Sequence, residues 1–380
     1  MEALLRPREP GRPGRGPGLP RRQVGRLRAA RQSLTQVLIL ADDLTGAADC
    51  AAAFLGRARE VAVRLDALAR AGAPVMSVDL DTRSRPERAA RTIVRRAFAS
   101  RGAKRASILY KKIDSTLRGH VAAELAALRG ALPGRPVLFA PAFPAQGRTV
   151  RGAVLHLRGK PASGDLRALL SKAGLPATLV MSASAAGLRS ALAASARALV
   201  CDAASDAELD RIARAGLALR PRPIFVGSAG LARALARALP RRRAAPVPAI
   251  DKRPVLTVIG SASPVSVRQA RALGPGDPLV RVAWRREPTP DDVPTIRRLG
   301  RSVALAAPDV HYVLTGGETA RAVLGARGIR ELRLLGEVEP GVPFGMARDG
   351  TLVCTKAGAF GSPATLARCV ARLKNEMRRS

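Results

Sequence analysis

The chain has 380 residues, of which 47% are hydrophobic, and its 65 Lys and Arg against 29 Asp and Glu give a formal net charge of +36. This length allows two domains with buried cores, and no apolar run reaches the roughly 18 residues of a membrane-spanning helix. Aromatic residues make up only 3% of the chain, too few for the stacking surfaces of a typical nucleic-acid-binding protein. The positive charge is therefore attributed mainly to a general arginine-rich composition, although it would still attract small anions.

Cysteine usage favours a reducing compartment. Cys50, Cys201, Cys354 and Cys369 lie far apart without paired spacing, and the three histidines are also scattered, which excludes a zinc-type cluster. Residues 1–35 are rich in Arg, Pro and Gly and lack the apolar core of a secretion signal. We therefore predict a cytoplasmic protein with a disordered N-terminal tail.

From residue 37 onward, short apolar runs alternate with segments rich in Ala, Leu and Arg. This alternation indicates βαβ units and a mostly parallel sheet. The strands predicted in the first half lie at 37–41, 73–80, 106–114, 136–143, 197–203 and 222–230. The helices predicted there lie at 46–55, 85–98, 120–128, 206–215 and 231–238.

A break in the pattern separates the two halves. Residues 239–254 combine a run of arginines with four prolines, which is typical of an interdomain linker. Apolar runs then resume at 255–263, 279–284, 310–320, 332–338 and 350–361. The sequence thus predicts an α/β fold of two α/β domains with mostly parallel sheets, at 36–238 and 255–380.

Charged residues of the first half gather where predicted strands end. Asp42 and Asp43 follow the first strand, 79–83 reads DLDTR, and 111–119 reads KKIDSTLRG. Ligands of open α/β sheets bind at the carboxyl ends of the strands. This mixture suits a small polyhydroxylated anion, because arginines can clamp a carboxylate and an aspartate can accept a hydroxyl proton. Each aspartate could instead cap the following helix, and that alternative stays open.

The strand ends of the second half are rich in glycine and hydroxyl side chains. They read GSAS at 260–263, TGGET at 315–319 and KAGAFG at 356–361. Small residues let backbone amides approach phosphate oxygens, and the N-terminus of a following helix adds a favourable field. With Lys356 beside one of these loops, the pattern predicts a nucleotide phosphate site. The Walker A pattern is absent, which argues against a P-loop enzyme.

Several of these stretches together resemble the four-carbon acid sugar kinase family, once grouped only as a domain of unknown function. Its members phosphorylate sugar acids such as threonate and erythronate with ATP. The stretches that carry the resemblance are ADDLTGAAD (41–49), KKIDSTLRGH (111–120), APAFPAQGR (140–148), GSASP (260–264), TGGETA (315–320) and TKAGAFG (355–361).

The resemblance implies a sugar-acid-binding N-terminal domain and an ATP-binding C-terminal domain, with Mg²⁺ and an active site in the interdomain cleft. The residues it places at the substrate are Asp42, Asp43, Arg83, Lys112, Ile113, Asp114 and Ser115, to which we add Arg118 on chemical grounds. The residues it places at the nucleotide are Ser261, Ser263, Gly316, Gly317, Glu318, Thr319, Gly358 and Gly361, to which we add Lys356. Asp42, Asp43 and Asp114 are the candidates for the catalytic base, and the metal ligands stay unknown.

Two stretches, 151–170 and 264–314, are short for the family and leave two alternatives open. One is a catalytically inactive relative that binds ligand without turnover. The other is a basic nucleic-acid-binding protein, although we expect no specific nucleic acid and no membrane as partners. The identity of the acid sugar and the oligomeric state, for which a homodimer is one option, are left open by the sequence.

Overall fold

The structure is a computed structural model that describes residues 36–66, 72–181, 183–193, 197–274, 276–281 and 292–379. The predicted tail at 1–35 lies outside the described residues, as do residues 282–284 of the strand predicted at 279–284. In the part of the chain that the structure describes, no helix is long and apolar enough to cross a membrane.

Strands and helices alternate along most of the described chain. The strands are β1 (Val37–Ala41), β2 (Val61–Arg64), β3 (Val75–Asp79), β4 (Ile108–Lys112), β5 (Val137–Ala140), β6 (Arg148–Arg151), β7 (Val154–Leu157), β8 (Lys160–Asp165), β9 (Ala177–Val180), β10 (Ala198–Cys201), β11 (Ile224–Gly227), β12 (Val255–Ile259), β13 (Leu279–Arg281), β14 (His311–Thr315), β15 (Glu331–Glu339), β16 (Val342–Met346) and β17 (Leu352–Lys356). The helices are α2 (Leu44–Ala52), α3 (Glu87–Ala99), α4 (Arg101–Arg105), α5 (Val121–Ala131), α6 (Leu166–Lys172), α7 (Ala185–Ala193), α8 (Asp206–Ala218), α9 (Ala229–Arg237), α10 (Pro264–Ala270), α11 (Val293–Ala306), α12 (Gly317–Ala326) and α13 (Thr365–Arg379), with a 3₁₀ turn, η1, at Pro144–Gln146.

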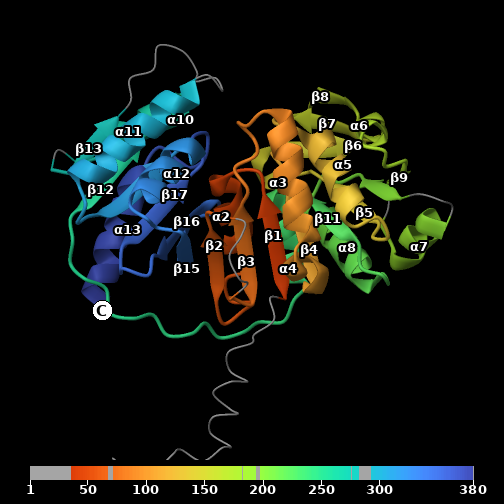
Figure 1. The fold of residues 1–380 in the computed structure, drawn as a ribbon, viewed down its shortest axis with the longest axis horizontal. Coiled ribbons are helices and arrows are strands. Elements are labelled where there is room, and N and C mark those ends of the chain that lie inside the picture. The colour runs from red at the N-terminus through yellow and green to blue at the C-terminus, as the bar shows by residue number, and fades with distance from the viewer. Residues whose placement is uncertain are drawn as a thin grey trace, which may run out of the picture. The chain divides into compact units, whose positions relative to one another are not determined.

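One large sheet contains 14 of the described strands, in the order β13-β12-β14-β17-β16-β15-β2-β3-β1-β4-β11-β5-β10-β9 (Figure 1). β1 pairs parallel with β3 and β4, and β14 pairs parallel with β12 and β17. β15 pairs antiparallel with β2 and β16, and β16 pairs antiparallel with β17. The strands of the two predicted domains therefore join in a single, mostly parallel sheet. The described strands β6, β7 and β8 form a separate antiparallel sheet.

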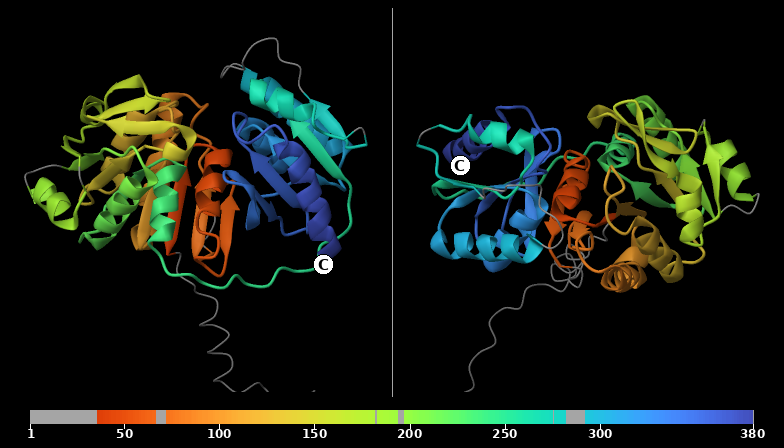
Figure 2. Two further views of the ribbon diagram at one scale, coloured as in Figure 1. Left: turned by 180° about the vertical axis from the view of Figure 1, so that it is seen from behind. Right: turned by 90° about the horizontal axis from the view of Figure 1, so that it is seen from above.

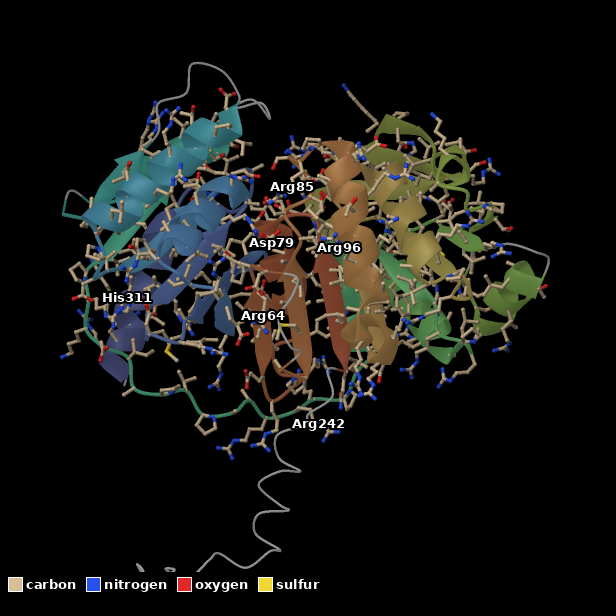
Figure 3. All side chains as sticks on the ribbon, in the orientation of Figure 1. Arg64, Asp79, Arg85, Arg96, Arg242 and His311 are labelled. Atoms are coloured by element: carbon tan, nitrogen blue, oxygen red, sulfur yellow. The ribbon has the colours of Figure 1, made fainter. Side chains whose placement is uncertain are left out.

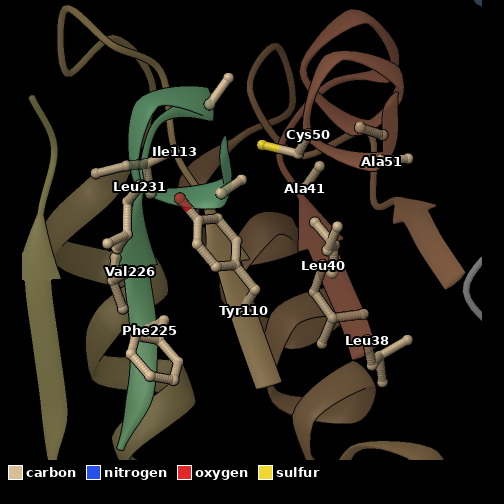
Figure 4. Close-up of a cluster of buried hydrophobic side chains, with 14 of the residues drawn as sticks. Leu38, Leu40, Ala41, Cys50, Ala51, Tyr110, Ile113, Phe225, Val226 and Leu231 are labelled. Atoms are coloured by element: carbon tan, nitrogen blue, oxygen red, sulfur yellow. The ribbon is translucent and has the colours of Figure 1, made fainter. Parts of the chain in front are cut away.

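The central strands are buried, which explains their uninterrupted apolar sequences. Every residue of β1 is buried, and Leu40 lies beside Tyr110 of β4 in Figure 4. Val226 of β11 lies on the other side of the Tyr110 ring. The Tyr110 hydroxyl donates a hydrogen bond to the carbonyl of Ser228, so burial of this ring leaves its polar atom satisfied.

Helices cover both faces of the large sheet (Figure 2). α3 packs against α5, α2 against α9, and α11 against α12. α2 begins at Leu44 because the Asp43 side chain accepts a hydrogen bond from the amide of Gly46. α8 begins with a capping box formed by Ser205 and Glu208. These caps fix where helices leave the strand ends, and so they position the loops between them.

The predicted strands and helices of the first half are confirmed, and so are the predicted strands of the second half as far as they are described. The structure adds β2, β6–β9 and β16, which were not predicted. Residues 241–254 contain neither helix nor strand, although Arg242 and Ala245 donate backbone hydrogen bonds to the carbonyls of Gly56 and Arg59. The predicted linker thus runs as an extended segment against the first half.

Candidate active site

A pocket of about 370 Å³ lies at the carboxyl ends of β1, β4, β11, β12, β14 and β17. Residues of both 36–238 and 255–380 line it. Its volume is within the range of pockets for small molecules, roughly 300–1,000 Å³. The structure brings the following predicted site residues together in its wall: Asp43, Arg83, Lys112, Asp114, Ser115, Arg118, Ser261, Ser263, Gly316, Gly317, Glu318, Thr319 and Gly358.

Asp43 combines a structural role with a place in this wall. Its Oδ1 accepts hydrogen bonds from the amide of Gly46 at 3.0 Å and from Nη2 of Arg83 at 2.9 Å. Its Oδ2 accepts one from the hydroxyl of Thr45 at 2.6 Å. Burial alone would raise the pKa of Asp43, but Arg83, Lys112 and the Thr45 hydroxyl lower it. The helix-capping alternative is therefore correct for Asp43, and the same ionised carboxylate also faces the pocket.

Asp42 has different surroundings, although it is adjacent in sequence. Only 3% of the residue is exposed, and it does not line the pocket. Its Oδ2 accepts a hydrogen bond from Nε of Arg83 at 2.8 Å, and its Oδ1 lies 3.8 Å from Nζ of Lys112. Burial raises the pKa of Asp42 against the attraction of these two cations. Asp42 therefore positions Arg83 and Lys112 from the protein interior and does not itself reach the pocket.

Arg83 lies among three carboxylates. Besides Asp42 and Asp43, Asp114 approaches its Nη1 at 3.6 Å. Burial would lower the pKa of Arg83, but the three carboxylates raise it. The guanidinium thus neutralises the carboxylates of Asp42, Asp43 and Asp114.

Asp114 and Arg118 form a close pair. Nε and Nη2 of Arg118 donate to the two carboxylate oxygens at 3.0 and 2.9 Å, and the amide of Thr116 donates at 3.0 Å. Burial opposes ionisation, yet these hydrogen bonds and the nearby cations hold the pKa of Asp114 well below its usual range. The Arg118 side chain is 70% exposed. Asp114 is therefore a fixed anion that also orders the loop after β4.

Lys112 and Ser115 line the pocket, whereas Ile113 is buried beside it. The amide of Ile113 donates to the carbonyl of Gly227, which ties the loop to β11. Burial would lower the pKa of Lys112, but Asp42 and Asp43 raise it. A side chain at Gly46 would lie against Oδ1 of Asp43 and Nζ of Lys112 and would force one of them to shift.

On the opposite wall, the N-terminus of α12 faces the pocket. Gly316 precedes the helix with a φ of 97°, which favours glycine, and no side chain of the described residues caps the helix there. The first amides of α12 therefore lack intrahelical partners and form a potential anion site. A methyl group at Gly317 would lie 3.2 Å from Oδ2 of Asp43. This proximity brings the loop TGGET against the strand-end carboxylate of β1.

Two predicted nucleotide residues lie behind the wall rather than in it. Lys356 is fully buried, and its Nζ donates to the carbonyls of Ala357, Gly358 and Phe360 at 2.9, 3.0 and 3.1 Å. Burial lowers the pKa of Lys356 to about 8. Gly361 has a φ of 89° and packs against Thr365. Both residues shape the loop after β17 and do not line the pocket.

The pocket wall also contains residues that the sequence analysis did not assign to the site. The most informative are Asp49, Phe143, Arg148, Ser228 and Phe360. Ser228 follows β11, so the strand-end rule that identified Asp43 could have found it. Asp49 lies within α2, and Nη2 of Arg233 donates to it at 2.9 Å. The strand-end rule could not identify Asp49, because this residue lies inside a helix.

Ionic contacts link the loop after β3 to α11 and α12. Asp81 lies 3.1 Å from Nη2 of Arg297 and 3.2 Å from Nε of Arg321. Arg321 also donates to Asp79, which Figure 3 labels at the end of β3. Glu318 accepts hydrogen bonds from Arg297 and, at 2.6 Å, from the hydroxyl of Ser84. The loop that carries Arg83 is thus tied to the first turn of α12.

The sequence matches two family models. Residues 37–166 and 165–235 match the one described as a sugar-binding N-terminal domain, and residues 294–366 match the nucleotide-binding C-terminal domain. These matches follow the two sides of the pocket, since Asp43 and Asp114 belong to the first and Gly316 and Gly317 to the second.

Two proteins named D-threonate kinase are similar over nearly the whole chain. The one from Cupriavidus necator is 39% identical, covering 87% of this chain and 96% of its own, and the one from Bordetella bronchiseptica is 34% identical, covering 88% and 97%. A solved Haemophilus influenzae structure of the DUF1537 family model shares the fold, with a TM-score of 0.66, 19% identity, and coverage of 88% of this chain and 99% of that one. The chain belongs to the four-carbon acid sugar kinase family and is a carbohydrate kinase.

Proposed function

We propose that the chain transfers the γ-phosphoryl group of ATP to a hydroxyl of a four-carbon sugar acid, with D-threonate as the first candidate. The relatives named D-threonate kinase support this substrate class. The observation that carries the proposal is the approach of Asp43, at the end of β1, to Gly317 at the uncapped N-terminus of α12. A hydroxyl beside Asp43 would lie next to a phosphate held by α12.

In this proposal each side of the pocket binds one of the two ligands. Residues 36–238 bind the sugar acid, residues 255–380 bind the nucleotide, and 239–254 link them, with the active site in the cleft between. The backbone amides of α12 and the loops at Gly260 and Gly358 would hold the phosphates. A side chain at Gly260 would collide with Thr319, and one at Gly358 with Ser261, which supports a requirement for small residues there. Lys356 would act indirectly, by supporting the second loop.

Asp43 is our candidate for the group that accepts the hydroxyl proton. It is ionised and faces the pocket, whereas Asp42 is behind the wall and Asp114 is engaged by Arg118. A low pKa makes Asp43 a weak base. Phosphoryl transfer tolerates this, because its transition state depends mainly on positioning and on stabilisation of charge.

The metal proposed for this site is Mg²⁺. Among the described residues, no group of three or more His, Cys, Asp or Glu side chains could hold a metal. Mg²⁺ commonly keeps several waters and binds substrate phosphates, so phosphates and waters would supply most of its ligands near Gly317, and Asp43 stays the proposed proton acceptor. Bound there, the ion would neutralise charge on the transferred group. A cytoplasmic location and a homodimer stay predictions from the sequence.

The test is ATP consumption by the purified full-length chain with Mg²⁺ and D-threonate, L-threonate, D-erythronate or L-erythronate. We expect turnover on one acid, and its loss in Asp43→Asn and Asp114→Asn variants that still bind ATP. A folded protein that binds ATP and an acid without turnover would support the inactive relative instead. A protein that binds neither ligand would contradict the proposal.

A further inference from the structure

The sugar-acid side of the pocket contains four cationic side chains, and three of them already have carboxylate partners. Arg83 contacts Asp42, Asp43 and Asp114, Lys112 lies 3.8 Å from Asp42, and Arg118 pairs with Asp114. A substrate carboxylate would have to compete with these internal partners for any of the three cations. The internal aspartates are ionised or buried and cannot move away without breaking the loops that they order.

Arg148 is the fourth cation, and its situation is different. It lines the pocket and is half-buried, yet no carboxylate of the described residues lies within ion-pair distance of it. Its Nη1 donates to the carbonyl of Gln146, which orients the guanidinium. Its Nε is buried without a hydrogen-bond partner among the described residues. Burial lowers the pKa of Arg148, and only the more distant attraction of Asp114 opposes this among the described residues, whereas Arg83 has direct ion pairs.

The backbone fixes Arg148 at the pocket edge. The amide and carbonyl of Arg148 exchange hydrogen bonds with Phe143 at 3.1 and 2.8 Å, closing the turn η1. Gly147 adopts a φ of 70° in this turn, and Arg148 begins β6 (Figure 1). A guanidinium held by a closed turn loses little freedom when it binds a ligand.

We propose that Arg148 binds the carboxylate of the substrate through its guanidinium group and thereby selects sugar acids over neutral sugars. The inference rests on the proposed function, since it takes a sugar acid as the substrate. A planar guanidinium presents N–H groups in a fixed fork that matches a carboxylate, and Arg148 has no carboxylate partner among the described residues. The sequence predicted that Arg83 and Arg118 bind the substrate carboxylate. We assign this role to Arg148 instead, because Arg83 and Arg118 are already paired with aspartates of the protein.

The test compares the wild type with Arg148→Gln, Arg148→Lys and Arg158→Gln. Arg158 is the matched control: it is an exposed arginine that packs against Gly147, does not line the pocket, and has a φ of 49° that glutamine tolerates no worse than arginine. The readouts are the dissociation constants for D-threonate and for the neutral polyol threitol, and kcat and KM with D-threonate. Thermal melting checks that each variant is folded.

We expect Arg148→Gln to weaken D-threonate binding about 100-fold and to raise its KM similarly, with KM for ATP and threitol binding unchanged. Arg148→Lys, which keeps charge but loses the fork, should recover part of the loss, and Arg158→Gln should match the wild type. An unchanged D-threonate affinity in a folded Arg148→Gln variant would overturn the inference, as would an equal loss in Arg158→Gln.

The binding readout separates this inference from the proposed function. If the wild type binds D-threonate through Arg148 but never phosphorylates it, the kinase proposal fails while the carboxylate site stands. If the wild type phosphorylates the acid and Arg148→Gln does so equally well, the carboxylate assignment fails alone. Binding of none of the four acids to the wild type would overturn both.

Discussion

At the scale of single residues, Asp42 and Asp43 are adjacent in sequence but have different roles. Successive residues at a strand end point in different directions, so Asp42 points to the interior and Asp43 to the pocket. Asp42 meets the cations Arg83 and Lys112 there, and Asp43 meets the amides at the start of α2. Buried carboxylates of this kind require partners, and here each has one.

The first prediction concerns Asp43→Asn. Asparagine caps helices about as well as aspartate, so the melting temperature should change by only a few degrees. The loss of a carboxylate that accepts a proton should lower kcat by about 100-fold or more. Steady-state kinetics and thermal melting measure the two effects separately. Wild-type turnover in this variant would remove Asp43 from the role of base.

The second prediction concerns Asp79, whose carboxyl is buried at the end of β3. Burial raises its pKa to about 7, against the attraction of Arg321, whereas an unfolded aspartate has a pKa of about 3.9. The folded state therefore binds this proton more tightly. The resulting stabilisation is complete below about pH 4 and is lost as the pH rises to about 7.

Asp79→Asn removes this dependence on pH. The free energy of unfolding of the variant minus that of the wild type should become more positive between about pH 4 and pH 7 and then level off. Urea denaturation across that range measures it. The control is Asp309→Asn, since the Asp309 side chain is 84% exposed. Parallel curves for Asp79→Asn and the wild type would contradict the raised pKa.

Much of the site could be predicted from residue types at strand ends, because the carboxyl ends of parallel strands meet at one edge. Asp43, Asp114 and Gly317 follow this rule. The rule identifies loops but not the direction of each side chain, so it could not separate Asp43 from Asp42. It also could not show that internal aspartates occupy Arg83 and Arg118, since those pairs depend on tertiary contacts.

At the scale of elements, the loop after β17 shows a backbone supported by one buried cation. Lys356 donates to three carbonyls of this loop and lies 3.3 Å from the hydroxyl of Ser266. In Lys356→Met these carbonyls would lose their donor. We expect a loss of about 2–3 kcal/mol in the free energy of unfolding and weaker ATP binding.

Denaturant titration and ATP titration measure the two consequences of Lys356→Met. Lys374→Met is the matched control, because Lys374 makes a surface ion pair with Asp277 and its side chain is 50% exposed. That control should cost at most about 1 kcal/mol. Full ATP affinity in a stable Lys356→Met variant would show that the loop does not depend on this lysine.

The predicted strands were correct where long apolar runs cross the sheet, as in β1 and β14. β16 was missed because its sequence, VPFGM, contains Pro343 and Gly345, which count against a strand when read alone. β6–β8 were missed because they form a small antiparallel sheet whose residues are largely polar and partly exposed. Such strands form because they pair with segments that lie far away in the sequence, and a local sequence pattern does not predict this pairing.

At the scale of the whole molecule, several contacts among the described residues join residues 36–238 to residues 255–380, and two of them bear on coupling. One is the antiparallel pairing of β15 with β2. The other is the ionic network in which Arg297 reaches both Asp81 and Glu318. Asp81 has a φ of 53°, which is unusual for a residue other than glycine, and its ion pairs hold that conformation. Sequence patterns do not predict this network, because its members come from three separate elements.

The last prediction follows from this network. Because Arg297 connects the loop of Arg83 with Glu318 in the first turn of α12, ordering of either segment by its ligand should favour binding of the other ligand. In the wild type we expect a non-hydrolysable ATP analogue to tighten D-threonate binding about 5-fold or more. In Arg297→Met each ligand should still bind alone, but the enhancement should fall close to 1.

Arg298→Met, at an exposed neighbour on α11, is the control. Calorimetric titrations of each ligand, with and without the other, complete the cycle, and the enhancement must be equal in both directions. An enhancement that Arg297→Met leaves intact would mean that the coupling does not depend on Arg297 and passes through the remaining contacts, such as Ser84 with Glu318 or the pairing of β15 with β2.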